Sequence, residues 1–292
     1  MIFAFIQAHP EHAVARWAPF LEVSSSGYYA WQRERERRQE RDQAYAKRIE
    51  QVFEASGGTY GADRVAGQLR RDGYPASFKK VKRIMNEQGL FSVHLRYQRS
   101  LTDSRGARDE DYPNLLRDMP EIRPFQALSS DITYIPTQEG FAYTCTIRDL
   151  RSGIVLAEQT ASRMKKELVL DTLRSAVKSW KLEKGTIFHS DRGSQYTSEA
   201  VREYLRELGF RQSFSRTGKP GDNTWSESFY SILKKELVHP IGRFRTREEA
   251  AQGVFAFIHS FYNTHRIQKC LGYLSPMEWL NRYYNSTLKI SA

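Results

Sequence analysis

The sequence predicts an α/β protein in which a mixed β-sheet flanked by helices follows all-helical units. Residues 1–90 space their apolar side chains as helices do. Three short runs rich in β-branched and aromatic residues then follow at 128–136, 141–148 and 154–157, joined by turns. Beyond them, helical and strand-like patterns alternate. Adjacent runs predict antiparallel strands and alternation predicts helices on the sheet faces, so the sheet is expected to be mixed.

Residues 1–57 are predicted to form an N-terminal helical region. Apolar residues at Val14, Trp17, Ala18 and Leu21 follow helical spacing, and residues 24–27 break it. The run from Arg33 to Arg48 mixes both charge signs, which is typical of a solvated helix. It holds too few apolar residues for a dimerising coiled coil.

Residues 58–100 are predicted to form a helix-turn-helix DNA-binding region. An apolar stripe through Val65 and Leu69 ends at Asp72–Pro75, and Ser77 can cap a second helix that Gly89 closes. The predicted core face of that second helix is Phe78, Val81 and Met85. Its outer face carries amide and basic side chains, as major-groove recognition helices do; the predicted DNA contacts are Lys79, Lys80, Lys82 and Arg83, beside Asn86. The alternative is an ordinary helical hairpin with a solvated basic face.

The rest of the chain divides into a predicted linker at 101–123, a catalytic core at 124–285 and a tail at 286–292. Apolar periodicity fades in the linker, which is rich in polar residues. Two capping boxes, at 246–249 and 275–278, predict the last two helices of the core. We expect the chain to fray after Tyr284.

Three acidic residues stand out in the predicted core. Asp131 lies inside a strand, where Asp is uncommon, and Asp191 follows the short strand 186–189. Glu227 lies in the first turn of a helix that begins near residues 221–223, and Lys234, two turns later, shares its face. Thirty-five residues, 192–226, separate Asp191 from Glu227.

Each of these residues also has a structural interpretation. Asp191 precedes Arg192-Gly193, which is ordinary turn chemistry, and a solvated surface explains Lys234. Asp149 and Glu236 are competing carboxylates, but a turn explains the first and the second falls on another helical face.

The order of these residues resembles the DDE transposases and retroviral integrases. The local sequence motifs are similar to those of the second-frame (OrfB) transposases of the IS-three insertion-sequence family. The matching stretches are 131–135, 189–196, 222–229, and 262–266 with 271–276. The resemblance implies an RNase H-like core in which Asp131, Asp191 and Glu227 are catalytic and hold two Mg²⁺ ions, with Mn²⁺ as a substitute. Hard carboxylate oxygens suit Mg²⁺, and two such ions clamp the attacking and leaving oxygens of a phosphodiester.

The resemblance further implies a transposase that cleaves DNA at insertion-sequence ends and transfers the freed 3′-hydroxyl to a target. Lys234 would contact DNA near the reacting end. Expected partners are double-stranded DNA, further copies of the chain on that DNA, and the upstream-frame product (OrfA), as a fusion or a partner. The alternative is a non-catalytic DNA-binding regulator that keeps the fold.

Composition agrees with a polyanionic partner. Lys and Arg outnumber Asp and Glu by 45 to 34, which gives a net charge of +11. The two cysteines lie far apart, which argues against a zinc site or a disulfide framework. Because no run approaches the roughly 20 apolar residues of a membrane span, we expect a soluble protein of the bacterial cytoplasm, associated with the nucleoid.

Overall fold

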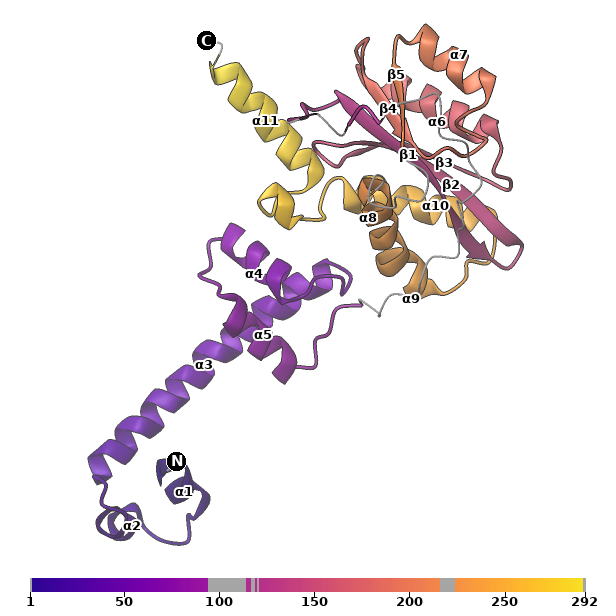
Figure 1. Cartoon of the computed structure of the whole chain (residues 1–292). Coiled ribbons are helices and arrows are strands. Elements are labelled where there is room, and N and C mark those ends of the chain that lie inside the picture. Colours follow the sequence, from indigo (N-terminus) through magenta and orange to yellow (C-terminus); the bar gives the residue numbers. More distant parts are fainter. Residues whose placement is uncertain (1, 94–113, 117–118, 120, 216–223, 291–292) are drawn as a thin grey trace. The chain divides into compact units, whose positions relative to one another are not determined.

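The computed structural model describes residues 2–93, 114–116, 119, 121–215 and 224–290, in two compact units, Met1–Ser92 and Val93–Ala292 (Figure 1). The two regions predicted at 1–57 and 58–100 therefore share one unit. In the described residues, no helix has both the length and the apolar character needed to cross a bilayer. The cytoplasmic localisation stays a prediction.

The first unit is all helical, as predicted. It consists of α1 (Ile2–Ala8), α2 (Val14–Phe20), α3 (Ser25–Ala55), α4 (Ala62–Arg71) and α5 (Phe78–Glu87). Ser24 caps α3 by accepting a hydrogen bond from the Gly27 amide at 3.0 Å, and Ser77 caps α5 through the Lys80 amide at 3.3 Å. The predicted charged run lies in the long helix α3, where most of its described side chains are exposed.

The predicted core face of α5 is wrong at one position. Val81 and Met85 are buried as expected, but Phe78 is 47% exposed and Ile84 is buried in its place. Phe78 is the first residue of α5, so its side chain extends past the part of the helix that packs against the rest of the unit. Ile84 completes the stripe formed by Val81 and Met85, at spacings of three and four residues.

The second unit contains the predicted mixed sheet of five strands. Strands β1 (Ala127–Thr137), β2 (Gly140–Asp149) and β3 (Val155–Ala161) are antiparallel, and β4 (Ile187–Ser190) and β5 (Arg211–Phe214) run parallel to β1. The order is β3-β2-β1-β4-β5, so β1 is central. Each strand lies within a few residues of its predicted position.

Helices cover both faces of this sheet (Figure 1). α6 (Lys166–Ser179) and α7 (Glu199–Glu207) pack on one face through a core that includes Leu128, Ile147 and Phe188. α8 (Thr224–Leu233) and α10 (Arg247–Ala256) pack on the other through Ile135, Ala142 and Val155. On β2, Ala142 belongs to the second core and Cys145 and Ile147 to the first; on β3, Val155 belongs to the second core and Leu156 and Ala157 to the first.

Helix α8 continues as a π-helix at Lys234–Val238 and then as α9 (His239–Ile241); α10 likewise continues as a π-helix at Phe257–Tyr262. A 3₁₀ helix follows at Lys269–Leu271, and α11 (Pro276–Ile290) ends the described chain. The capping box of α11 is complete: the Ser275 amide donates to Glu278 Oε2 at 2.8 Å, and the Glu278 amide to Ser275 Oγ. The helix passes the point at which we predicted fraying, because it continues to Ile290.

Two predicted boundaries lie largely outside the described residues. Most of the linker, 101–123, is not described, but Leu116 is buried against Ala127 and Ile187, so its end packs with the sheet. The predicted start of the Glu227 helix at 221–223 is not described either.

Candidate active site

Two of the predicted acids meet where the central strand runs beside β4. In the parallel register Ser129 lies opposite His189, so Asp131 and Asp191 are each two residues farther in the same direction. Neighbouring strands are about 4.8 Å apart. The side-by-side position of these acids therefore follows from the strand pairing.

Local hydrogen bonds orient both carboxylates. The Ile132 amide donates to Asp131 Oδ1 at 2.8 Å, and the Gly193 amide donates to Asp191 Oδ1 at 3.0 Å. A Cβ at Gly193 would lie 3.0 Å from that Asp191 oxygen and 2.9 Å from Gln195 Oε1. The turn after β4 therefore needs a glycine to approach the Asp191 carboxylate so closely.

Glu227 reaches the same region from the first turn of α8. Phe229 and Leu233 are fully buried and fix the helix on the sheet. Tyr230 ties α8 to the central strand: its hydroxyl donates to the Asp131 carbonyl oxygen and meets Thr146 Oγ1 at 2.9 Å.

The electrostatics show that Asp131 is influenced by the other two acids. Burial, the Asp191 charge and the Glu227 charge all raise the pKa of Asp131, to about 7, against the opposing effects of the Ile132 amide and Lys234. Loss of hydration also raises the pKa values of Asp191 and Glu227, although both residues keep exposed surface. The site thus holds more negative charge than its own cations neutralise.

Lys234 lies on the predicted face, because it and Glu227 both act on the pKa of Asp131. Its Nζ is 4.5 Å from the centre of the Tyr134 ring. Burial lowers the pKa of Lys234, while the Asp131 charge opposes this effect. Tyr134 in turn makes an edge contact with Phe141, and both rings are exposed at 41% and 50%.

The two competing carboxylates are structural. Glu236 forms a fully buried pair with Arg266: Nε and Nη2 donate to its two carboxylate oxygens, each at 2.7 Å. Asp149 is buried and accepts hydrogen bonds from Ser152 and from the Phe125 amide. These findings agree with the expectation that neither acid belongs to the candidate triad.

The segment Tyr262–Arg266, which carries part of the resemblance, also supports the fold. Asn263 accepts from the Val155 amide at 3.0 Å and donates to the Val155 carbonyl at 2.9 Å. Tyr262 accepts a hydrogen bond from Arg148. This segment therefore secures strand β3 and the π-helix that follows α8.

Three residues near Asp191 take structural positions. His189 is buried and its Nδ1 lies 2.9 Å from Ser213 Oγ. Tyr196 is buried with its hydroxyl 3.1 Å from Ser130 Oγ, on the α6 side of the sheet. Gln195 donates to the Met164 carbonyl at 3.2 Å and lines a shallow hollow of about 340 Å³ beside α6.

The carboxyl oxygens of the triad fit a divalent cation in donor type and in charge. A carboxyl whose pKa is raised to about 7 by burial and by neighbouring carboxylates would be stabilised in its charged form by a cation among them. Across the described ranges, no three His, Cys, Asp or Glu side chains stand close enough together to hold a metal ion. The acids are therefore neighbours without forming a ready-made ligand cage, and metal binding remains a prediction.

The four predicted DNA-contact residues lie on α5 in the first unit, and their surroundings differ. Lys79 and Lys82 are exposed. Lys80 Nζ and Arg83 Nη2 lie 3.1 and 2.6 Å from the two oxygens of Asp42, which is on α3. Whether these residues bind DNA is not tested by the structure.

Sequence reasoning missed three residues that shape these sites. Tyr230, which binds the Asp131 backbone, lies one turn after Glu227, and the sequence marks it only as an apolar helix position. Asp42 lies inside a mixed-charge run with nothing to distinguish it from its neighbours. The contact of Tyr134 with Lys234 joins residues 100 positions apart, which no local pattern reveals.

Comparison with known proteins identifies the parts of the chain. Residues 121–220 and 227–284 match families described as integrase core domain, and residues 40–99 match one described as HTH-like domain. The catalytic core domain of BIV integrase, a solved structure, is similar at a TM-score of 0.42 and 18% identity, over 56% of this chain and 98% of that one.

Two relatives are similar over most of the chain. The transposase for insertion sequence element IS904 of Lactococcus lactis is 36% identical over 242 residues, 82% of this chain and 94% of the relative. The transposase InsF for insertion sequence IS3A of Escherichia coli is 33% identical over 287 residues, 97% of this chain and 99% of the relative. The chain therefore belongs to the family of IS3-type insertion-sequence transposases with an integrase core domain.

Proposed function

We propose that this transposase cleaves DNA at the ends of an insertion sequence and joins the freed 3′-hydroxyl to target DNA, with Mg²⁺ held by Asp131, Asp191 and Glu227. The observation that carries the proposal is that Asp191 and Glu227 lie near Asp131 at the edge between β1 and β4, where burial, followed by the charges of these two acids, raises the pKa of Asp131 to about 7. Bound Mg²⁺ would supply charge neutralisation at the phosphate and activation of the attacking oxygen.

The proposed chemistry is two balanced displacements at phosphorus. In the first, a water oxygen bonds to phosphorus, the bond to the 3′-oxygen breaks, the water proton passes to solvent, and the leaving 3′-oxygen takes up a proton to become the free hydroxyl. In the second, the freed 3′-oxygen bonds to a target phosphorus, its proton is lost, and the target 3′-oxygen leaves and is protonated. No protein side chain becomes covalently attached to DNA, so no Ser or Tyr nucleophile is assigned.

The chain's own residues hold and orient the reactants. Asp131 is fixed on the central strand by Tyr230, and Asp191 by the Gly193 amide. Lys234, next to these acids, is proposed to bind a phosphate near the reacting end. The exposed basic side chains of α5 are proposed to bind duplex DNA.

The test is joining of a labelled insertion-sequence-end duplex to target DNA with Mg²⁺ or Mn²⁺. Wild-type chain should join the two only with the metal, and Asp131→Asn, Asp191→Asn and Glu227→Gln should each still bind DNA without joining it. Glu203→Gln is the matched control, because Glu203 is exposed on α7 in the same unit. Joining by the Glu227→Gln variant would remove that residue from the triad.

A non-catalytic regulator is the competing function. It is favoured if the wild-type chain binds end DNA tightly but neither cleaves nor joins it with any divalent metal. The positions of Asp191 and Glu227 near Asp131 argue against it, since a binding-only protein has no need of two acids that raise the pKa of a third.

We further propose that the active assembly contains at least two copies of this chain and an upstream-frame product that supplies end recognition. Joining two DNA ends requires two active sites, and the charged run in α3 holds few apolar residues for dimerisation. The isolated chain should bind DNA with little preference for ends, and fusion to the upstream product should restore that preference. Efficient, end-specific transposition by the 292 residues alone would contradict this proposal.

A further inference from the structure

The cationic side chains of α5 divide into two stripes. Lys79, Lys82 and Asn86 follow the spacing i, i+3, i+7, and Lys80, Arg83 and Glu87 follow the same spacing one residue later. At 100° per residue, the centres of the two stripes are about 100° apart around the helix. Val81, Ile84 and Met85 form the third, buried side. The two polar stripes therefore face different surroundings.

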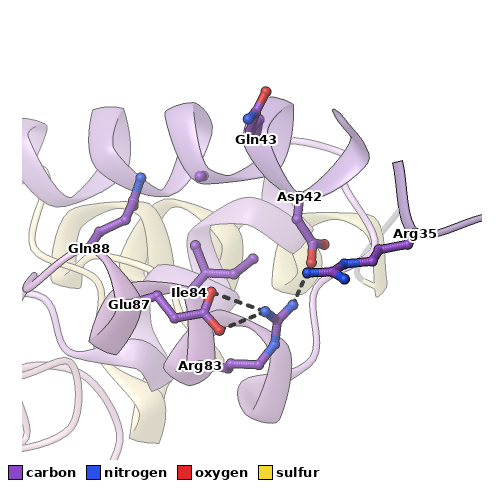
Figure 2. A pocket seen from close by; sticks show the side chains of 8 residues that line it. Arg35, Asp42, Gln43, Arg83, Ile84, Glu87 and Gln88 are labelled. Atoms are coloured by element: carbon purple, nitrogen blue, oxygen red, sulfur yellow. Dashed lines mark hydrogen bonds and ion pairs between the residues drawn. The ribbon is translucent and has the colours of Figure 1, made fainter. Parts of the chain in front are cut away.

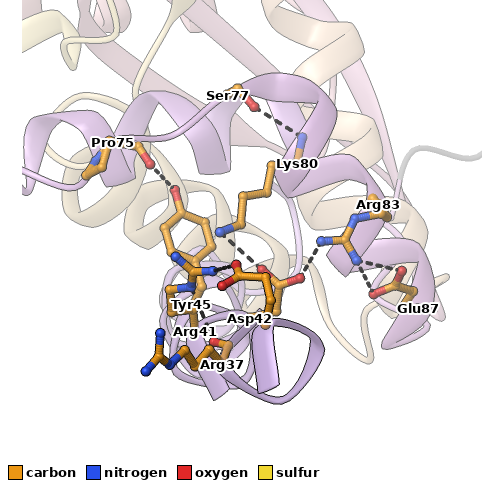
Figure 3. Close-up of polar contacts among 10 residues, drawn as sticks. Arg37, Arg41, Asp42, Tyr45, Pro75, Ser77, Lys80, Arg83 and Glu87 are labelled. Carbon is orange, nitrogen blue, oxygen red and sulfur yellow. Dashed lines mark hydrogen bonds and ion pairs between the residues drawn. The ribbon is translucent and has the colours of Figure 1, made fainter. Parts of the chain in front are cut away.

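The stripe that contains Lys80 and Arg83 faces α3. Asp42 on α3 lies 3.1 Å from Lys80 Nζ and 2.6 Å from Arg83 Nη2, and Arg83 Nη1 also reaches both oxygens of Glu87, at 2.8 and 3.0 Å (Figure 3). Lys80 Nζ lies 4.3 Å from the Tyr45 ring centre, and the Tyr45 hydroxyl donates to the Pro75 carbonyl. This stripe joins α3 to α5 and to the turn before α5.

Carboxylates of the protein engage the cations on this side. A hollow of about 540 Å³ lies between α3 and α5, and its lining includes Asp42, Gln43, Arg83 and Glu87. In Figure 2 the Arg83 guanidinium lies between the carboxylates of Asp42 and Glu87. Lys80 and Arg83 keep 38% and 41% of their side chains exposed, so their ion pairs, and not burial, withhold them from DNA. Arg83 is therefore directed toward protein.

The other stripe is open. Lys79, Lys82 and Asn86 are exposed, and among the described residues neither Lys79 nor Lys82 forms an ion pair. Phe78, at the start of the helix, is 47% exposed, and Lys82 Nζ lies 5.8 Å from its ring centre. Two uncompensated cations, an amide and an apolar ring on one side of a helix match the phosphate, base-edge and thymine-methyl contacts of a duplex.

We infer that α5 binds duplex DNA through Phe78, Lys79, Lys82 and Asn86 alone. Lys80 and Arg83 are positioning residues in this inference, because their ion pairs with Asp42 hold them away from the phosphates. The inference rests on the proposed DNA binding and narrows the four predicted basic contacts to two. Asp42 has two functions in it: it fixes the angle of α5 against α3 and lowers the net positive charge that DNA meets. The protein thereby limits binding that depends on charge alone and leaves the stripe of Lys79, Lys82 and Asn86 free to bind DNA.

The test is the salt dependence of binding by the full chain to a fluorescently labelled, mixed-sequence DNA duplex. Each lost phosphate contact lowers the slope of log affinity against log salt by about 0.9. Lys79→Ala and Lys82→Ala should each lower the slope by this amount, whereas Lys80→Ala and Arg83→Ala should leave it unchanged. Lys79 and Lys80 are a matched pair, since they are adjacent and carry the same chemistry. Asp42→Asn should raise the slope by about one contact, because it releases Lys80, whereas Arg83 keeps its pair with Glu87.

Selection from a randomised duplex pool tests the base contacts. Asn86→Ala should alter the preferred sequence, and Lys79→Ala should weaken binding without altering it. Equal slope losses for Lys79→Ala and Lys80→Ala, or an Asp42→Asn slope like that of wild type, would overturn the inference while leaving the proposed function intact. A wild-type chain that binds no duplex would overturn both. Circular dichroism melting of each variant separates lost contacts from lost folding.

Discussion

Asp42 and Asp131 have opposite surroundings, and the difference separates architecture from chemistry. Asp42 lies between two cations, and their hydrogen bonds and charges hold its pKa below the ordinary value although partial burial opposes them. Asp131 lies among acids, and burial with the Asp191 and Glu227 charges raises its pKa to about 7. An acid with cationic partners is already neutralised, whereas an acid crowded by other acids is stable only with a proton or an added cation.

Glu236 is the extreme of the first kind. It lies nine residues after Glu227, just beyond the end of α8, yet it is fully buried against Arg266. Proximity in sequence therefore does not decide function. What decides function is the charge of the groups that the fold places beside each carboxylate.

The largest expected effect that would sharpen the comparison between Asp42 and Asp131 is on the rate of strand joining. Asp131→Asn, Asp191→Asn and Glu227→Gln should each lower the strand-joining rate by roughly a thousandfold or more, since each removes a proposed metal ligand worth several kcal/mol. Single-turnover joining rates measure this. Near-wild-type rates in all three variants would place the active site elsewhere.

A second prediction concerns stability. Glu236→Gln should destabilise the second unit by about 3–5 kcal/mol, because it leaves the Arg266 charge buried and uncompensated. Urea unfolding monitored by circular dichroism measures the loss, and the exposed Glu203→Gln should change stability by less than about 0.5 kcal/mol. Replacing both partners, by Glu236→Leu with Arg266→Met, should restore part of the loss. A mild effect of Glu236→Gln would mean that this pair is not structural.

A third prediction follows from the sign of the Asp131 shift. Because the pKa is about 7 in the folded protein against an ordinary 3.8, the folded state binds the proton more tightly, and stability falls as the pH rises between these values. Asp131→Asn removes this loss, so above pH 7 the variant should be more stable than wild type by at most roughly 4 kcal/mol, and near pH 3 the two should be equal.

Melting temperatures across this pH range, without divalent ions, test the third prediction. Added Mg²⁺ at pH 8 should then raise the melting temperature of wild type more than that of Asp131→Asn. A wild-type advantage at pH 8 without metal would show that Asp131 is stabilised by partners rather than strained by neighbours.

The smallest effect is expected at Asp42. Its folded pKa is lowered, so its contribution is present above the ordinary pKa of 3.8 and is lost as the pH falls through the folded value. Asp42→Asn should therefore destabilise the first unit at pH 7 by no more than about 1 kcal/mol, since the pair is partly exposed. Thermal melts at pH 7 and pH 2 measure it, and a loss that persists at pH 2 would show that packing, not charge, is responsible.

The sequence by itself determined the elements and the candidate acids. Strand 211–214 and the capping box at 275–278 are local signals, in which a few neighbouring residues satisfy one another, and the structure contains both. At 246–249 the Glu249 amide donates to Thr246 Oγ1, while Glu249 Oε2 accepts from the Arg245 amide. Asp131 is readable as an Asp inside a strand, whereas Asp191 and Glu227 stand out by their order and spacing, which resemble those of the DDE transposases.

Only the tertiary structure decided which charges meet. Nothing local distinguishes Lys79 from Lys80, yet Lys79 is exposed and forms no ion pair with the residues that the structure describes, whereas Lys80 is 3.1 Å from Asp42 because its side of α5 faces α3. Nor does any local pattern assign Glu236 to Arg266, 30 residues away, or raise the pKa of Asp131 through Asp191. Burial and pairing depend on elements far apart in the chain, so the environment of a charge is a property of the fold.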